Sequence, residues 1–193
     1  MSKYTLSTIL FIATTTWGIA QTANLGGTFT TDSGAPIAGV VINLLDSQSQ
    51  VIATEVTNGA GNYEFTNIPT NQTYTIDAEK NDVPINGLST FDLVVTAKHI
   101  LGIQMLDSPY RILAADVNQS GTVTTLDVVT MRSLILAMSS ELPDGVEWIF
   151  VPANYTFPSP TNPFPFTPNN SITLTQSISD ANFIGVKLGN INN

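Results

Sequence analysis

The sequence has no cysteine among its 193 residues, so no disulfide can stabilise the fold. Because His99 is also the single histidine, the chain lacks the ligands for a zinc site. Motifs for a nucleophile elbow, a phosphate-binding loop or a dinucleotide-binding loop are absent as well. These gaps favour a protein that is not an enzyme. They also leave a bound metal ion as an alternative source of stability.

Basic residues are few: the chain has 6 Lys and Arg against 15 Asp and Glu, for a formal net charge of −9. This balance argues against nucleic acid as a partner, because proteins bind phosphates through Lys and Arg. It argues equally against an anionic membrane surface. Charged residues make up only 11% of the chain, whereas Thr, Ser, Asn and Gln are abundant. Such a composition is typical of extracellular β-rich proteins.

Residues 1–20 have the features of a secretory signal peptide. Lys3 supplies a positive charge, residues 6–16 are mostly apolar, and small residues precede a cleavage point near Ala20. The apolar segment is too short to span a bilayer, and a buried first strand is the alternative. We therefore expect a secreted or cell-surface protein that meets a membrane only during export.

Residues 21–80 alternate short β-branched segments with turn residues, which is typical of a small antiparallel β-sandwich. The candidate strands cover residues 28–31, 39–45, 50–57, 63–65 and 74–78. Tyr63 and Phe65 lie two residues apart and therefore share one face of their strand. We expect that face to point into the core and not to stack on a sugar.

Glycines, prolines and alternating apolar residues in this segment form a spaced pattern: Gly27, Pro36, Ile37, Gly39, Val40, Gly61, Tyr63, Phe65, Ile68, Pro69, Tyr74 and Ile76. In this pattern the segment resembles a carboxypeptidase-regulatory-like or Cna-B-like domain. The resemblance implies an Ig/transthyretin-like antiparallel β-sandwich. It also implies a role as a stalk or spacer in a surface or secreted protein.

Residues 116–127 read D-V-N-Q-S-G-T-V-T-T-L-D, with oxygen-bearing side chains at the first, third, fifth, ninth and twelfth places. Calcium takes about six to eight oxygen ligands, and a loop of this spacing wraps around the ion. Glycine at the sixth place allows the sharp turn. The expected calcium ligands are Asp116, Asn118, Ser120, the Thr122 carbonyl, Thr124 (directly or through water) and Asp127. A polar turn before an Asp-capped helix is the alternative.

Two segments, residues 89–103 and 124–138, carry apolar residues near helical spacing, and each begins with a capping box. Aligned at an offset of 35 residues, they share five identities in fifteen pairs. The chain therefore contains an internal repeat of a loop followed by a helix.

A duplicated calcium loop with one following helix resembles a type I dockerin. The stretch 89–135 is similar to the form found in exported Bacteroidetes proteins. Dockerins bind cohesins, so the resemblance implies a cohesin-like or other surface protein as partner, although the Bacteroidetes relatives often have no known cohesin. It implies contacts at Thr90, Thr125 and Leu126, where each loop meets its helix. Leu126 could equally be a core residue, and Phe91 is expected in the core.

The first loop, residues 81–92, departs from the calcium pattern because Val83 and Ile85 occupy two ligand places. An irregular second calcium site remains conceivable, formed by Asp82, Asn86, the Gly87 carbonyl, Ser89 and Asp92. The alternative is that Asp92 only caps the following helix, where its charge suits the positive end of the helix dipole.

Two further segments complete the expected domain organisation. Pro109 is expected to limit any helix within residues 103–115. We expect residues 81–142 to form the dockerin-like repeat module and residues 143–193 to form a β-rich extension packed on it. Within that extension, residues 152–168 are rich in proline and aromatic residues.

These features predict a mixed α and β protein with a non-catalytic, calcium-binding scaffold or anchoring role. Two carboxylates brought together by folding could act as acid and base, but Asp92, Asp116 and Asp127 are already assigned to calcium or capping. One alternative is a surface adhesin, matrix or fibre subunit that associates with itself, in which calcium only makes the fold rigid. A carbohydrate-binding role would need exposed coplanar rings, for which residues 155–166 are the candidates.

Overall fold

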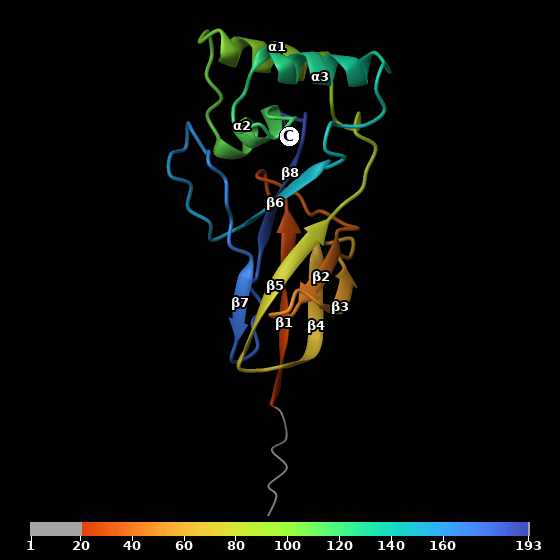
Figure 1. Ribbon diagram of the computed structural model, residues 1–193, viewed down its shortest axis with the longest axis vertical. Coiled ribbons are helices and arrows are strands. Elements are labelled where there is room, and N and C mark those ends of the chain that lie inside the picture. The colour runs from red at the N-terminus through yellow and green to blue at the C-terminus, as the bar shows by residue number, and fades with distance from the viewer. Residues whose placement is uncertain (1–20, 193) are drawn as a thin grey trace, which may run out of the picture.

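Two four-stranded β-sheets pack face to face, and three helices cover one end of this sandwich (Figure 1). The computed structural model describes residues 21–192, so the expected signal peptide lies outside the described residues. Within that range, no helix combines the length and apolar character needed to cross a bilayer.

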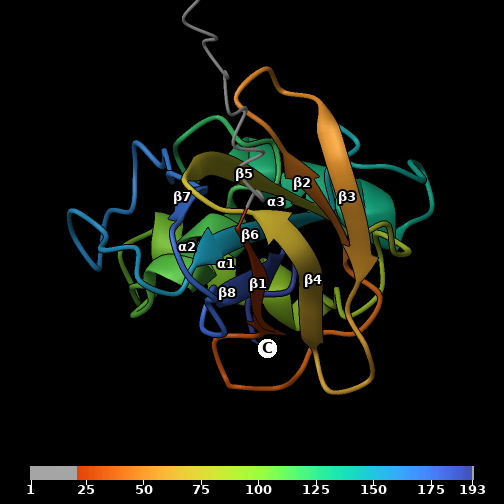
Figure 2. The same cartoon turned by 90° about the horizontal axis from the view of Figure 1, so that it is seen from below.

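The view from below separates the two layers of strands (Figure 2). One sheet has the order β4-β1-β8-β6, with β4 at Asn62–Pro69, β1 at Thr22–Thr30, β8 at Phe183–Lys187 and β6 at Trp148–Pro152. The other has the order β3-β2-β5-β7, with β3 at Val51–Val56, β2 at Val41–Leu45, β5 at Gln72–Glu79 and β7 at Ser171–Leu174. Paired strands are antiparallel except β1 and β8, which are parallel.

The C-terminal strands differ from expectation because they complete the sandwich. We expected residues 143–193 to pack on the repeat module, but in addition β8 pairs with β1, and β7 pairs with β5. Without these partners, β1 and β5 would be edge strands with unpaired backbone groups. Phe150, Leu174 and Phe183 also fill the core between the sheets.

The sandwich core follows the alternation of apolar residues along the strands. In β1, Leu25 and Phe29 are fully buried, and in β2 the same holds for Ile42 and Leu44. Tyr63 and Phe65 of β4 are both buried in this core, as expected from their shared face. The β-sandwich predicted from residues 21–80 is therefore present, and later strands extend it.

The three helices are α1 at Thr90–Ile100, α2 at Pro109–Ala115 and α3 at Thr125–Ile135. Helices α1 and α3 fall in the two repeated segments and lie side by side at the end of the molecule (Figure 1). Pro109 limits the helix in this segment, as expected, because α2 begins at Pro109 and does not extend before it. Proline is favoured there, since the first helical N–H has no partner within the helix. Helix α2 itself was not predicted.

A second apolar cluster lies between the helices and the sandwich. Its buried members include Leu113 of α2, Met131 of α3, Val186 of β8, and Ile191 near the chain end. Aromatic residues of the 152–168 segment pack against the same cluster. The extension therefore contacts the helices as expected and also belongs to the sheets.

A candidate calcium loop and an exposed helix face

The candidate calcium loop starts where α2 ends, because Asp116 is the C-terminal cap residue of that helix. Its carboxylate is buried and points into the loop. Oδ1 accepts a hydrogen bond from the Ser120 N–H at 3.0 Å, and Oδ2 accepts one from the Gly121 N–H at 2.8 Å. Gly121 has a φ of 82°, which favours glycine and permits this turn.

Asp127 closes the loop from the first turn of α3 and is fully buried. Its Oδ2 accepts hydrogen bonds from the Thr124 N–H at 2.8 Å and from the Thr124 hydroxyl at 3.1 Å. Its Oδ1 accepts a hydrogen bond from the Asn118 N–H at 3.3 Å. The Asp127 carboxylate therefore connects the end of the loop to its beginning.

Burial raises the pKa of Asp116, and the charge of Asp127 raises it further, while the N–H groups of Gly121 and Ser120 act in the opposite direction. Burial and the neighbouring Asp127 carboxylate both disfavour the charged form of Asp116. A divalent cation would supply the missing positive charge.

The remaining expected ligands gather along the same loop. The Ser120 hydroxyl donates to the Thr122 carbonyl at 3.1 Å, and the Asn118 side-chain oxygen accepts from the Ser120 N–H at 3.0 Å. Thr124 accepts a hydrogen bond from the Leu126 N–H, as a helix cap does. All candidate ligands present oxygen, and the two carboxylates carry the charge, so the donor types suit calcium.

The described residues contain no group of three or more His, Cys, Asp or Glu that could hold a metal ion. A calcium shell here would therefore depend on neutral oxygens beside Asp116 and Asp127. The six-residue ligand set from Asp116 to Asp127 stays a prediction.

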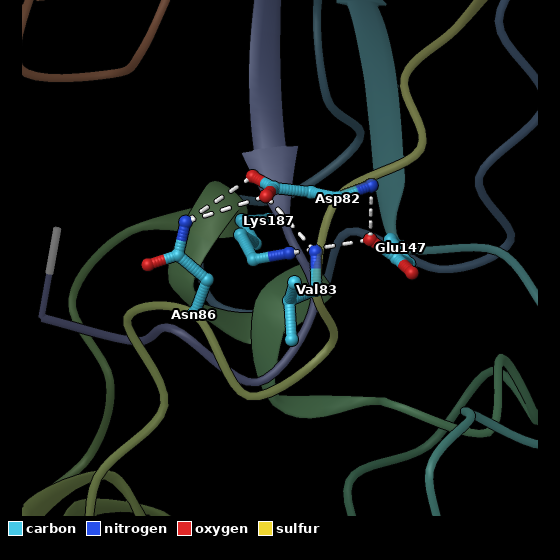
Figure 3. A network of polar contacts seen from close by, with 5 residues as sticks. All are labelled: Asp82, Val83, Asn86, Glu147 and Lys187. Atoms are coloured by element: carbon cyan, nitrogen blue, oxygen red, sulfur yellow. Dashed lines mark hydrogen bonds and ion pairs between the residues drawn. The ribbon is translucent and has the colours of Figure 1, made fainter.

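The first loop holds its candidate ligands in two separate groups. Asp82 accepts hydrogen bonds from the Val83 N–H at 2.9 Å and from the Asn86 amide at 3.4 Å (Figure 3). Asp92 instead accepts bonds from the Ser89 N–H at 2.8 Å and the Ser89 hydroxyl at 2.7 Å. Gly87 has a φ of 81°. The second calcium site is untested, and its two acids have protein partners of their own.

Lys187 is a residue of this region that sequence reasoning did not identify. Its side chain is 4% exposed, and Nζ lies 3.6 Å from Oε2 of Glu147 (Figure 3). The same oxygen accepts a hydrogen bond from the Asp82 N–H at 2.6 Å. Nζ also lies 5.5 Å from the ring centroid of Trp148. The one signal in the sequence is that Lys187 is the single cation of the last strand.

Electrostatics tie Lys187 to Asp82. Burial lowers the pKa of Lys187, and the nearby carboxylates of Asp82 and Glu147 partly offset this effect. Burial acts to raise the pKa of Asp82, but the Val83 N–H, the Asn86 amide, Lys187 and Lys80 together lower it. The carboxylate and the ammonium therefore stabilise each other in charged form.

Helices α1 and α3 expose apolar side chains at matching repeat positions. Phe91 and Val94 of α1 and its C-cap residue Leu101 are 57%, 50% and 71% exposed, and their spacing puts them on one side of the helix. Their equivalents in the second repeat are exposed to a similar degree: Leu126 at 59%, Val129 at 56% and the C-cap residue Leu136 at 54%. We call these six residues the exposed helix face. The expectation that Phe91 lies in the core was wrong.

Of the expected partner-contact residues, Leu126 belongs to this face, and Thr90 and Thr125 directly precede Phe91 and Leu126 in sequence. Thr90, Thr125 and Leu126 are all exposed at the start of their helices. Few apolar residues of the two helices are buried. In α3 they are Met131 and Leu134, whereas the residues buried in α1 are the polar Asp92 and Thr96. Each helix therefore uses only part of its apolar surface for the core.

The rings of the aromatic segment pack against one another. Tyr155, Phe157 and Phe166 are half-buried, and Tyr155 meets the other two rings at angles of 84° and 81°. Phe157 and Phe166 are stacked, with planes 23° apart and centroids 6.1 Å apart. A carbohydrate-binding role for these rings stays a prediction.

Residues 24–99 match the carboxypeptidase regulatory-like domain family. Colossin-A of Dictyostelium discoideum is 37% identical over 94 residues, which are 48% of this chain and 1% of that much longer protein. The match to the family runs past the sandwich strands into α1, beyond the expected boundary at residue 80.

Among solved structures, BcpA, the major pilin subunit of Bacillus cereus, is 20% identical with a TM-score of 0.30. This similarity covers 32% of our chain and 19% of the pilin. The T6 backbone pilin of Streptococcus pyogenes is 21% identical with a TM-score of 0.28, over 30% of our chain and 12% of that protein. The pilus adhesin RrgA of Streptococcus pneumoniae is 22% identical with a TM-score of 0.28. This similarity covers 33% of our chain and 8% of the adhesin. The family match supports the expected carboxypeptidase regulatory-like β-sandwich in the N-terminal part of this chain, whereas the dockerin resemblance of residues 81–142 stays a prediction.

Proposed function

We propose that this protein is a non-catalytic, exported scaffold or anchoring protein that binds a protein partner through the exposed helix face. One observation carries the proposal: the same three places of each repeat expose large apolar side chains on two adjacent helices. Clustered exposed apolar residues on a soluble protein mark interaction sites more often than isolated ones do. Thr90, Thr125 and Leu126 would lie within this contact surface.

Calcium enters the proposal as a structural ion. The Asp116–Asp127 loop directly precedes α3, and Asp127 belongs to both the loop and the helix. When bound, calcium would supply positive charge between two buried carboxylates. Ordering of the loop would then set the position of α3 and of its half of the helix face.

A calcium-dependent pull-down with residues 21–193 from the secreted and surface fractions of the source cells tests this function. We expect saturable binding of one protein partner. Leu126→Asp and Val129→Asp should each abolish this binding. Ile52→Asp on β3 is a matched control, because Ile52 is similarly apolar and exposed but lies away from the helices. Capture that is unaffected by both helix-face variants would contradict the proposal.

Self-association as a surface or fibre subunit is the second candidate function, and β3 favours it. This strand is an edge of its sheet, and it exposes Val51, Ile52 and Val56. An exposed apolar edge can pair with a strand of a second copy. Size-exclusion chromatography tests this function. Oligomers that Ile52→Asp loses and Leu126→Asp retains would favour self-association over binding to a separate partner.

A further inference from the structure

The two repeats close their loops with equivalent aspartates. Asp92 and Asp127 lie 35 residues apart in sequence, are both fully buried, and both belong to a capping box. In each repeat Oδ2 accepts the N–H of the cap residue at 2.8 Å, from Ser89 in the first and Thr124 in the second. One carboxylate oxygen therefore performs the same task in both repeats.

The other oxygen has different partners in the two repeats. Oδ1 of Asp127 accepts a hydrogen bond from Asn118, within its own loop. The repeat equivalent of Asn118 is Val83, whose N–H donates to Asp82 instead. Oδ1 of Asp92 accepts a hydrogen bond from the Ile191 N–H at 2.9 Å, close to the end of the chain. The hydrogen bond to Oδ1 of the closing aspartate therefore comes from the C-terminal segment in the first repeat and from the loop itself in the second.

The segment that makes this contact is firmly packed. Leu188 is 1% exposed and Ile191 is 2% exposed, and the Gly189 N–H donates to the Ala114 carbonyl of α2 at 2.8 Å. The Asn190 side chain lies against the first loop, where a Cβ on Gly87 would come within 2.6 Å of its amide nitrogen. Residues 187–191 therefore run between the first loop and α2.

The same segment places a cation beside the first loop. Lys187 is buried beside Glu147, and Glu147 in turn accepts the hydrogen bond of the Asp82 N–H (Figure 3). In the second loop, Asp116 and Asp127 have no Lys or Arg hydrogen-bonded to them in the described part of the chain. Val83 and Ile85 occupy two ligand places of the first loop, and the charge of Lys187 lies beside that loop through Glu147.

We propose that residues 187–191 take the structural place of a metal ion in the first repeat. The α1 half of the exposed helix face is then held by the protein itself, and only the α3 half responds to calcium. The response of α3 rests on the calcium role proposed above, whereas the anchoring of α1 does not. The donor set of the first loop does not suit calcium, because Val83 and Ile85 offer no side-chain oxygen at two of the ligand places.

Hydrogen exchange of residues 21–193 with calcium and with chelator tests the asymmetry. We expect α1 amides to stay protected in chelator, and α3 amides to lose protection by at least an order of magnitude in rate. Calorimetry is expected to find one calcium ion per chain. A second calcium ion that is lost in Asp92→Asn, or α1 protection that falls with that of α3 in chelator, would overturn the proposal.

Variants in chelator test the C-terminal anchor without any role for calcium. Ile191→Pro removes the donor to Asp92, and Ile191→Ala removes side-chain volume but keeps the N–H. We expect α1 exchange to quicken several-fold more in the proline variant than in the alanine variant. Equal exchange in the two would overturn the role of this hydrogen bond.

Lys187→Met removes the charge but keeps an unbranched side chain, and Lys187→Arg keeps the charge. We expect exchange near Asp82 and in α1 to quicken in the methionine variant and to be partly restored in the arginine variant. Unchanged exchange in Lys187→Met would overturn the role of the cation. If calorimetry finds no calcium at all while these variants behave as expected, the calcium role fails and the anchor stands.

Discussion

Phe29 and Phe183 are register partners on the parallel strands β1 and β8, and their rings stack with centroids 4.9 Å apart and planes 9° apart. Both side chains are buried in the sandwich core. The pair joins the first strand to the last, so the carboxypeptidase regulatory-like region is completed by residues from the C-terminal part of the chain.

Phe183→Ala is expected to lower the free energy of unfolding by about 3–5 kcal/mol, because it removes a buried ring and leaves a cavity. Urea unfolding followed by tryptophan fluorescence measures the effect. Phe91→Ala is the control, since its ring is 57% exposed, and it should change stability by no more than about 0.5 kcal/mol. Similar losses in both variants would argue against the completed sandwich.

Calcium is expected to raise the melting temperature of residues 21–193 relative to chelator. Ligand present at 100 times its Kd stabilises by about 2.7 kcal/mol. Asp116→Ala should remove most of this shift, whereas Asp144→Ala should retain it, because Asp144 is an exposed aspartate outside the loop. Identical melting curves with calcium and chelator, together with no heat of binding, would disprove the site.

Acid is expected to weaken the fold partly through Asp82, whose pKa is lowered from its ordinary value of 3.8. A carboxyl with a lowered pKa contributes stability that is present above the ordinary value and is lost as the pH falls through the lower one. Protonation removes the attraction of Lys187 and weakens the bonds from Val83 and Asn86.

Unfolding in urea at a series of pH values, in chelator, should therefore show a shallower acid loss for Asp82→Asn than for the unaltered protein. Asp77→Asn serves as the comparison, because Asp77 lies exposed on β5. An acid profile that Asp82→Asn leaves unchanged would show that this carboxylate does not contribute.

The exposed helix face should be dispensable for stability. Leu126→Ala is expected to change the free energy of unfolding by less than about 0.5 kcal/mol. Met131→Ala, at a fully buried position of the same helix, is expected to cost about 2–5 kcal/mol. Comparable costs would indicate that Leu126 is part of the core and not of a contact surface.

Several features could be predicted from local sequence. The alternation in residues 21–80 indicated a sandwich, and two of the helices lie within the repeated segments, each opening with its capping box. The spacing of Tyr63 and Phe65 put both on one face of their strand, and the structure buries that face as expected. Local patterns suffice here because strand alternation and helix caps depend on residues only a few positions apart.

Other features depended on contacts between distant residues. Helix α2 was not predicted, although Pro109 occupies the first helical position, where proline is favoured. Phe91 was misplaced because apolar spacing marks one side of a helix without saying whether another element covers it. The anchor formed by Lys187 and Ile191 had no local signal, because its partners are distant in sequence. Ile191 donates to Asp92, 99 residues earlier, and Lys187 pairs with Glu147, which accepts the hydrogen bond of the Asp82 N–H.

The candidate calcium loop has both kinds of feature, some set by local sequence and some set by contacts between distant residues. The sequence alone determined its order of oxygen ligands, its glycine and its 35-residue echo, since these properties belong to consecutive residues. Only the tertiary structure decided that the echo is anchored by the C-terminal segment, because that contact forms when β8 enters the sandwich beside β1 and directs the chain end to Asp92.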